Sequence, residues 1–295
     1  MHIFAALASA LLFLSSLSLA VSDAAWAARA DAAAPAPAAR QTLAYGPDRA
    51  QTLDYWPGRG PGAPVVVFVH GGGWKRGDKT MMTGSAKLKD WQAQGYAVAA
   101  IDYRLVPQAS VEDEAADVAA AVAYLKANGA RLGLDPHRIV LVGHSAGAHL
   151  VALVGTDPTW LGAVGLKLSD LRGIVSLDGA AYDVPRQLEI GAPLMHQTYL
   201  QAFGADPARQ KRLSPTLQAG LPNAPEFLIL HVQRADGVEQ SEALAAALRK
   251  AGTKVTIEGF AGAGLRGHME INQRLGEPDY PATPVVDAFL KRVLG

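Results

Sequence analysis

The residues with the clearest capacity for chemistry form the motif Gly143-His144-Ser145-Ala146-Gly147. An apolar run, residues 139–142, leads into the motif, and a helical pattern of small residues follows it. In a sharp strand-to-helix turn the central residue takes strained backbone angles, and flanking glycines leave room for neighbouring chain. The turn lifts the Ser145 hydroxyl clear of the sheet, and the helix N-terminus aims unpaired amides at an anion that forms beside it. We therefore predict that Ser145 is a nucleophile.

A glycine-rich loop upstream could stabilise that anion. The β-branched run at residues 64–69 is typical of a strand buried on both faces, and it ends in His70-Gly71-Gly72-Gly73-Trp74. Consecutive glycines let the backbone approach a ligand closely and turn its amides toward it. The sequence predicts an oxyanion hole formed by the amides of Gly72, Gly73 and Ala146. Loss of one such donor commonly lowers the rate by about two to three powers of ten.

A serine hydroxyl needs an imidazole to take its proton, and a carboxylate must hold that imidazole in the right tautomer. Two later loops, each placed after a predicted strand, carry Asp236 and His268. We predict that His268 is the base and that Asp236 is the carboxylate that orients it. Glu239 in the same loop as Asp236, and Asp178 after the preceding strand, remain alternatives for the carboxylate.

These residues must be positioned by strands whose carboxyl ends meet at one edge of a sheet. Strand and helix patterns alternate from residue 64 onward, which predicts an α/β fold with a mostly parallel central sheet and helices on both faces. We expect an antiparallel hairpin at residues 42–57, and the proline-rich segment 182–225 is the candidate for a small cap. The expected strands are 64–69, 95–105, 138–144, 171–179, 225–232 and 254–260, and the expected helices are 85–94, 111–127, 240–250 and 283–294.

Composition bounds the class of protein. The chain has 295 residues, 49% of them hydrophobic, which is enough for one large α/β domain that we place at residues 41–295. Its 27 basic and 27 acidic residues form no long run of one sign, so nucleic acid is not indicated as a partner. The chain has no cysteine, which excludes disulfides, a thiol nucleophile and cysteine metal sites. Because the sequence shows neither metal-ligand spacing nor a phosphate-binding loop, we expect no metal and no cofactor.

The N-terminal residues predict export. Residues 3–21 are apolar except for four serines, and Ala25-Trp26-Ala27 supplies a cleavage pattern before Ala28. We expect a signal peptide at residues 1–27, a flexible leader at 28–40, and a periplasmic or secreted mature protein without stable membrane association. The extreme N-terminus lacks the expected Lys or Arg, so an uncleaved N-terminal anchor stays open as the alternative.

These motifs together resemble the α/β-hydrolase superfamily, in particular its hormone-sensitive-lipase-like carboxylesterases, kynurenine-formamidase-like enzymes and feruloyl or acetyl esterases. The resemblance implies a metal-independent serine hydrolase that forms an acyl-enzyme intermediate. Gln108 departs from the Glu that hormone-sensitive-lipase-like members have there, which favours the formamidase-like or feruloyl-esterase-like side, whereas an export signal does not suit a cytosolic formamidase. The segments that carry the resemblance are 70–74, 102–107, 143–150, the Asp236 loop and His268.

The leading hypothesis is an exported carboxylesterase that cleaves small acyl or aryl esters through Ser145, His268 and Asp236. An arylformamidase-like amide hydrolase would keep the same machinery and change the bond. A catalytically silent hydrolase fold used for binding is a third hypothesis, because a fold does not by itself establish a function. Trp74 and His144 flank the predicted site in the sequence, and we take them as candidate substrate-binding residues, although residues of both types also serve in packing.

Overall fold

The structure is a computed structural model that describes residues 39–220 and 222–295. The predicted signal peptide at residues 1–27, and the predicted leader up to residue 38, lie outside these ranges. Among the described residues, no helix combines the length and the apolar character needed to cross a bilayer.

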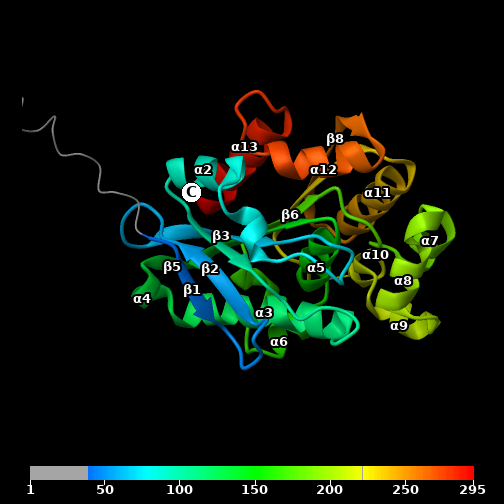
Figure 1. Cartoon of the computed structure of the whole chain (residues 1–295), viewed down its shortest axis with the longest axis horizontal. Coiled ribbons are helices and arrows are strands. Elements are labelled where there is room, and N and C mark those ends of the chain that lie inside the picture. Colours follow the sequence, from blue (N-terminus) through cyan, green and yellow to red (C-terminus); the bar gives the residue numbers. More distant parts are fainter. Residues whose placement is uncertain (1–38, 221) are drawn as a thin grey trace, which may run out of the picture. The chain divides into compact units, whose positions relative to one another are not determined.

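An eight-stranded sheet forms the centre of the described chain (Figure 1). Its strands are β1 (Gln41–Ala44), β2 (Thr52–Trp56), β3 (Ala63–Val69), β4 (Ala97–Ile101), β5 (Leu134–His144), β6 (Gly173–Leu177), β7 (Glu226–Gln233) and β8 (Lys254–Ala263). Their order is β1-β2-β4-β3-β5-β6-β7-β8, and every neighbouring pair from β4 to β8 is parallel. The antiparallel pairs are β1 with β2 and β2 with β4, as the predicted edge hairpin requires. The prediction of a mostly parallel sheet is confirmed.

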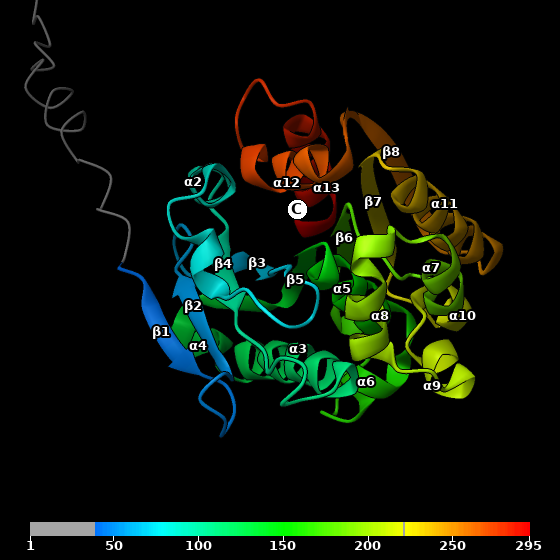
Figure 2. The same cartoon turned by 45° about the vertical axis from the view of Figure 1, so that its right-hand side comes forward.

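Helices cover both faces of this sheet (Figure 2). One face is covered by α2 (Ala86–Ala93), α12 (Gly264–Arg274) and α13 (Ala282–Leu294), whose apolar side chains form one core cluster with the strands. The other face is covered by α3 (Val111–Ala127), α5 (Ala146–Thr156), α6 (Pro158–Gly162) and α11 (Ala235–Lys250), and α4 (Gly129–Leu132) follows α3. Because both faces are buried, the central strands are continuously apolar instead of alternating.

The predicted cap segment contains several short helices. They are α7 (Val184–Ile190), the 3₁₀ turn η3 (Pro193–Met195), α8 (His196–Phe203), α9 (Pro207–Arg212) and α10 (Pro215–Gln218). Prolines stand in the first turn of four of these five elements, where the missing amide proton breaks no helical hydrogen bond. We refer to residues 184–218 as the cap segment. It lies at the end of the sheet where β5 passes into α5 (Figure 2).

Two regions expected as loops are largely helical. Residues 233–239 were expected to form a loop, but α11 begins at Ala235. Residues 261–267 were expected to form a glycine-rich loop, but β8 runs to Ala263 and α12 begins at Gly264. Glycines 262 and 264 have positive φ angles of 119° and 55°, so they make the sharp strand-to-helix turn themselves. His268 therefore lies in a helix near its N-terminus.

Candidate active site

Ser145 stands at the turn between β5 and α5, with φ 57° and ψ −119°. A residue with a Cβ atom rarely adopts these backbone angles, so the turn is strained, as the motif predicts. Its amide donates a hydrogen bond to the Leu177 carbonyl at 3.1 Å, which ties the turn to the end of β6. A Cβ on Gly147 would collide with the carbonyl of Val69, so only glycine lets α5 begin this close to β3.

The structure brings His268 and Ser145 together. The Ser145 hydroxyl lies 3.0 Å from His268 Nε2 and can donate its proton to that nitrogen. On the other side of the ring, His268 Nδ1–H donates to Asp178 Oδ2 at 2.6 Å. Ser145, His268 and Asp178 therefore form a continuous chain from a hydroxyl through an imidazole to a buried carboxylate, which is the geometry of a catalytic triad.

Asp236 does not occupy the position predicted for it. It lies in the first turn of α11, where its Oδ2 accepts a hydrogen bond from Gln187 Nε2 at 3.0 Å and its carboxylate is 3.4 Å from Arg234. Because α11 begins at Ala235, Asp236 lies in the first turn of the helix, and its carboxylate contacts Gln187 of the cap segment instead of His268. Glu239, the first alternative, pairs with Arg186 at 2.6 Å. The second alternative, Asp178, is the carboxylate that contacts His268.

Asp178 is completely buried at the end of β6. Burial alone would raise the pKa of this carboxyl, but the hydrogen bond from His268 and the charges of Arg234 and His268 outweigh it and hold the pKa below its usual range. The Val232 amide donates to its Oδ1 at 3.0 Å, and Arg234 Nε donates to its Oδ2 at 2.9 Å. Asp178 is therefore held as a carboxylate that can accept from His268.

His144 contacts His268 instead of presenting a surface to a substrate. Its Nε2–H donates to the backbone carbonyl of His268 at 2.8 Å, and the two ring centres are 4.6 Å apart. Only 3% of the residue is exposed. Burial, reinforced by the neighbouring His268, lowers the pKa of His144 to about 3, so the ring is neutral. The structure thus places His144 against His268, and its predicted role in substrate binding stays a prediction.

Trp74 is also a packing residue in this structure. It is 1% exposed and contacts Phe203 and Tyr199 of α8 edge-on, with ring centres 4.8 Å and 6.0 Å away. Its indole N–H donates to His149 Nδ1 at 3.3 Å, and His149 Nε2–H donates in turn to the Leu213 carbonyl at 2.8 Å. Trp74 thus joins the glycine loop to the cap segment, and its predicted contact with a substrate stays a prediction.

The glycine loop lies beside the nucleophile. A Cβ built on Gly71 would be 2.9 Å from the Cβ of Ser145, so a side chain there would displace the loop. Gly72 and Gly73 follow with positive φ angles of 138° and 62°. Ala146 is the first residue of α5, so its amide has no acceptor within the helix. The residues predicted to donate to an oxyanion thus come from the loop and the helix that flank Ser145.

Four residues other than glycine have positive φ among the described residues: Trp74, Ser145, Asp178 and Ala181. Two of them belong to the Ser145–His268–Asp178 chain, Trp74 ends the glycine loop, and Ala181 follows Asp178 by three residues. Strained backbone angles persist where the surrounding structure over-determines them, and they cluster at functional sites. This strain marks Asp178 as a functional residue independently of its contact with His268.

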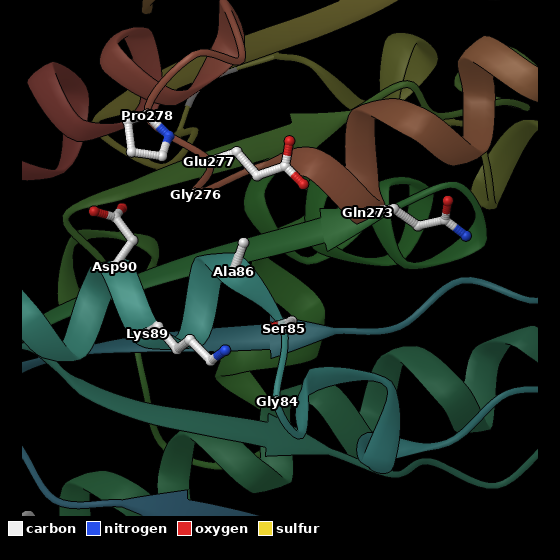
Figure 3. Close-up of a pocket in the computed structure, with 9 residues that line it drawn as sticks. All are labelled: Gly84, Ser85, Ala86, Lys89, Asp90, Gln273, Gly276, Glu277 and Pro278. Atoms are coloured by element: carbon white, nitrogen blue, oxygen red, sulfur yellow. The ribbon is translucent and has the colours of Figure 1, made fainter.

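A separate pocket of about 640 Å³ lies between α2 and the turn after α12 (Figure 3). Its lining includes Lys89, Asp90 and Glu277, and it includes no member of the Ser145–His268–Asp178 chain. Asp90 carries a pKa raised to about 6 by burial and by the nearby Asp287. Within residues 39–220 and 222–295, no group of three or more His, Asp or Glu side chains is arranged to hold a metal ion.

Solved structures share this fold. Esterase B from Lactobacillus rhamnosis superposes with a TM-score of 0.72 over 92% of this chain and 91% of that one, at 23% sequence identity. The chain has the α/β-hydrolase fold. A hyperthermophilic esterase from Pyrobaculum calidifontis, another structure of this fold, gives a TM-score of 0.71 over 88% of each chain at 21% identity.

Sequence comparisons place esterases among the relatives of this chain. The BD-FAE family model matches residues 55–161. Esterase LipC of Mycobacterium tuberculosis is 33% identical over 208 residues, which are 66% of this chain and 51% of LipC. Isoprenylcysteine alpha-carbonyl methylesterase ICME of Arabidopsis thaliana is 38% identical over 115 residues, which are 38% of this chain and 26% of ICME. The chain thus spans about half the length of LipC and about a quarter of ICME.

Proposed function

We propose that this protein is a serine carboxylesterase that cleaves small acyl or aryl esters through an acyl-enzyme intermediate. The observation that carries the proposal is the hydrogen-bonded chain from Ser145 through His268 to the buried Asp178. The esterase and methylesterase names of its sequence relatives support an ester as the bond that is cleaved.

The geometry accounts for acylation step by step. As Ser145 Oγ attacks the ester carbonyl carbon, its proton passes to His268 Nε2, and the carbonyl electron pair becomes an oxyanion. The amides of Ala146 and of Gly72 or Gly73 stabilise that oxyanion, while the Asp178 carboxylate stabilises the imidazolium. When the oxyanion collapses, the bond to the leaving oxygen breaks and His268 donates the proton to it. An alcohol departs, and the acyl group stays on Ser145.

Deacylation repeats the sequence with water. His268 takes a proton from a water molecule as the water oxygen attacks the acyl carbon. The second oxyanion accepts hydrogen bonds from the same backbone amides. Its collapse breaks the bond to Ser145 Oγ, to which His268 returns the proton, and a carboxylic acid leaves. The enzyme is regenerated without a metal or a cofactor.

The first experiment is fluorophosphonate labelling of the chain from Ala28, with the adduct located by mass spectrometry and the Ser145→Ala variant as control. We expect one adduct, on Ser145, and hydrolysis of p-nitrophenyl acetate that the variant lacks. A folded protein that neither labels nor hydrolyses the ester would refute the proposal and leave a binding protein on a hydrolase scaffold.

A paired substitution distinguishes the two carboxylates. Asp178→Asn keeps the shape but cannot hold His268 in the required tautomer, so we expect kcat to fall by about four powers of ten. Asp236→Asn keeps an oxygen that can accept from Gln187, so we expect kcat to stay close to that of the parent enzyme. Steady-state kinetics on p-nitrophenyl acetate measure both, and the reverse pattern would restore Asp236 as the acid.

We also propose that the enzyme works in the periplasm or outside the cell. The support is the apolar stretch at residues 3–21 followed by Ala25-Trp26-Ala27. N-terminal sequencing of the protein recovered from its native host is expected to begin at Ala28. A chain that begins at Met1 in the membrane fraction would favour the uncleaved anchor instead.

A further inference from the structure

Two donors share one oxygen of the carboxylate behind His268. Asp178 Oδ2 accepts from His268 Nδ1 at 2.6 Å and from Arg234 Nε at 2.9 Å. Arg234 is the residue just before α11, so it reaches from the end of β7 across to the end of β6. Its side chain is 15% exposed and that of Asp178 is fully buried. The ion pair is thus largely shielded from water.

Arg234 is itself held by other groups. One terminal nitrogen donates to the Gly179 carbonyl at 3.0 Å, one residue beyond Asp178. The other terminal nitrogen lies 3.4 Å from both oxygens of Asp236. A guanidinium presents its donors in a rigid fork and stays charged at all working pH values, so it fixes the position of a carboxylate as well as its charge.

We propose that Arg234 is a positioning residue for the proposed esterase reaction: it fixes the plane of the Asp178 carboxylate and holds it ionised, so that Asp178 can orient His268. The inference rests on the proposed function, because it assigns a role within that site. It also gives Asp236 a place beside the site without contact to His268, since Asp236 balances the charge of Arg234. Asp236 also accepts a hydrogen bond from Gln187 of the cap segment at 3.0 Å.

The electrostatic part of the proposal has a definite sign. The charge of Arg234 is among the influences that hold the pKa of Asp178 down, against burial, which raises it. Removing that charge lets Asp178 take up a proton at higher pH, so activity is lost at higher pH as the solution is acidified. The titratable and charged groups around Asp178 are Arg234, His268, His144, Tyr182 and Tyr280.

The test measures the rate of fluorophosphonate labelling of Ser145 between pH 5 and pH 9 for Arg234→Gln and Arg234→Lys. With Gln we expect the rate at pH 8 to fall about tenfold, because the carboxylate loses one of the donors that fix its plane. We also expect the acidic limb of the rate–pH profile to move to higher pH. With Lys we expect the acidic limb of the rate–pH profile to stay in place, because the positive charge remains. We expect the rate at pH 8 to fall about threefold, because the forked donors of the guanidinium are lost.

Arg186→Gln is the matched control. Arg186 also loses two carboxylate partners on substitution, Glu189 and Glu239, but its side chain is 46% exposed and touches no member of the Ser145–His268–Asp178 chain. We expect its labelling profile to match that of the parent. Thermal melting reports whether each variant folds. If Arg234→Gln does not fold, the comparison of Arg234→Lys with the parent is the test.

The outcomes separate the two proposals. If the parent protein fails to label, the proposed function fails, whatever the variants do. If the parent labels and both Arg234 variants keep its rate and its acid limb, the role of Arg234 is overturned. The proton resonance of His268 Nδ1–H gives a readout independent of the reaction. We expect Arg234→Gln to shift it and Arg186→Gln to leave it unchanged, and an unmoved resonance in Arg234→Gln would also overturn the inference.

Discussion

His144 connects the turn that holds Ser145 to the helix that holds His268. It immediately precedes Ser145, and its Nε2–H holds the carbonyl of His268. Its burial keeps it neutral, so it adds no positive charge next to an imidazole that must accept a proton. A residue that looks like a pocket-lining group in the sequence therefore acts, in the structure, on the orientation of the base.

Replacing His144 tests this role. His144→Ala removes the hydrogen bond and the ring that packs on His268, so we expect kcat to fall by about tenfold or more while KM changes little. His144→Gln can still donate to the His268 carbonyl and should recover part of the loss. Steady-state kinetics on p-nitrophenyl acetate measure both variants. Equal activity in the parent and His144→Ala would show that the contact does not matter.

The sequence could predict which residues lie at the site, but not which acid contacts the base. Carboxyl ends of neighbouring parallel strands meet at one edge of the sheet, so Asp178 and Asp236 were both reasonable. The choice depends on the positive φ of Asp178 and on the start of α11 at Ala235, which turns Asp236 toward Gln187. Both depend on tertiary packing that no local pattern encodes. The basic partner Arg234 was missed for the same reason.

Among the elements, the cap segment is joined to α3 by a two-pronged ion pair. Arg209 of α9 contacts Glu112 in the first turn of α3 through Nε at 2.8 Å and through a terminal nitrogen at 2.6 Å. Side-chain exposure is 23% for Arg209 and 31% for Glu112. This contact and the packing of Trp74 on α8 hold the cap segment to the rest of the fold from two sides.

The worth of this ion pair can be measured by a double-mutant cycle of Arg209→Gln and Glu112→Gln. We expect a coupling free energy of about 1 kcal/mol in urea unfolding, because the pair is bidentate but not fully buried. We also expect faster limited proteolysis within residues 184–218 in either single variant. Unchanged proteolysis would show that Trp74 and its neighbours hold the cap segment without help from the ion pair.

Helix boundaries were the weakest part of the predicted elements, while their order was the strongest. The strand patterns from residue 64 onward fall on β3 to β8 in the expected sequence. The stretches around 235 and 264 were expected as loops because they hold glycine and charged residues. They become helical because each is continuous with a helix whose apolar residues, for example Leu244 in α11 and Ile271 in α12, are buried against the rest of the fold, and packing outweighs local propensity.

For the molecule as a whole, two buried histidines link stability to pH. Burial lowers the pKa of His144 to about 3 and that of His149 to about 4, whereas both are near their ordinary value in the unfolded chain. The unfolded state therefore binds protons more readily, so the stabilisation is complete above about pH 6.5 and is lost as the pH falls toward the folded-state values.

We expect each of these histidines to lower the free energy of unfolding by about 2 kcal/mol between pH 7 and pH 5. Urea unfolding at the two pH values measures the total. His149→Gln should reduce the difference between the two pH values by about the share of one histidine, whatever it does to stability at pH 7. An undiminished difference in this variant would show that His149 is not the group that titrates.

The positive backbone angles at Ser145 and Asp178 have a consequence for how this sequence can change over time. Each such angle costs about 1 to 3 kcal/mol, and glycine at the same place would relieve much of that cost. We expect a Ser145→Gly variant to unfold at a higher temperature than the parent and to have no esterase activity. Selection for stability alone would therefore not keep serine at position 145, whereas use of the proposed reaction would.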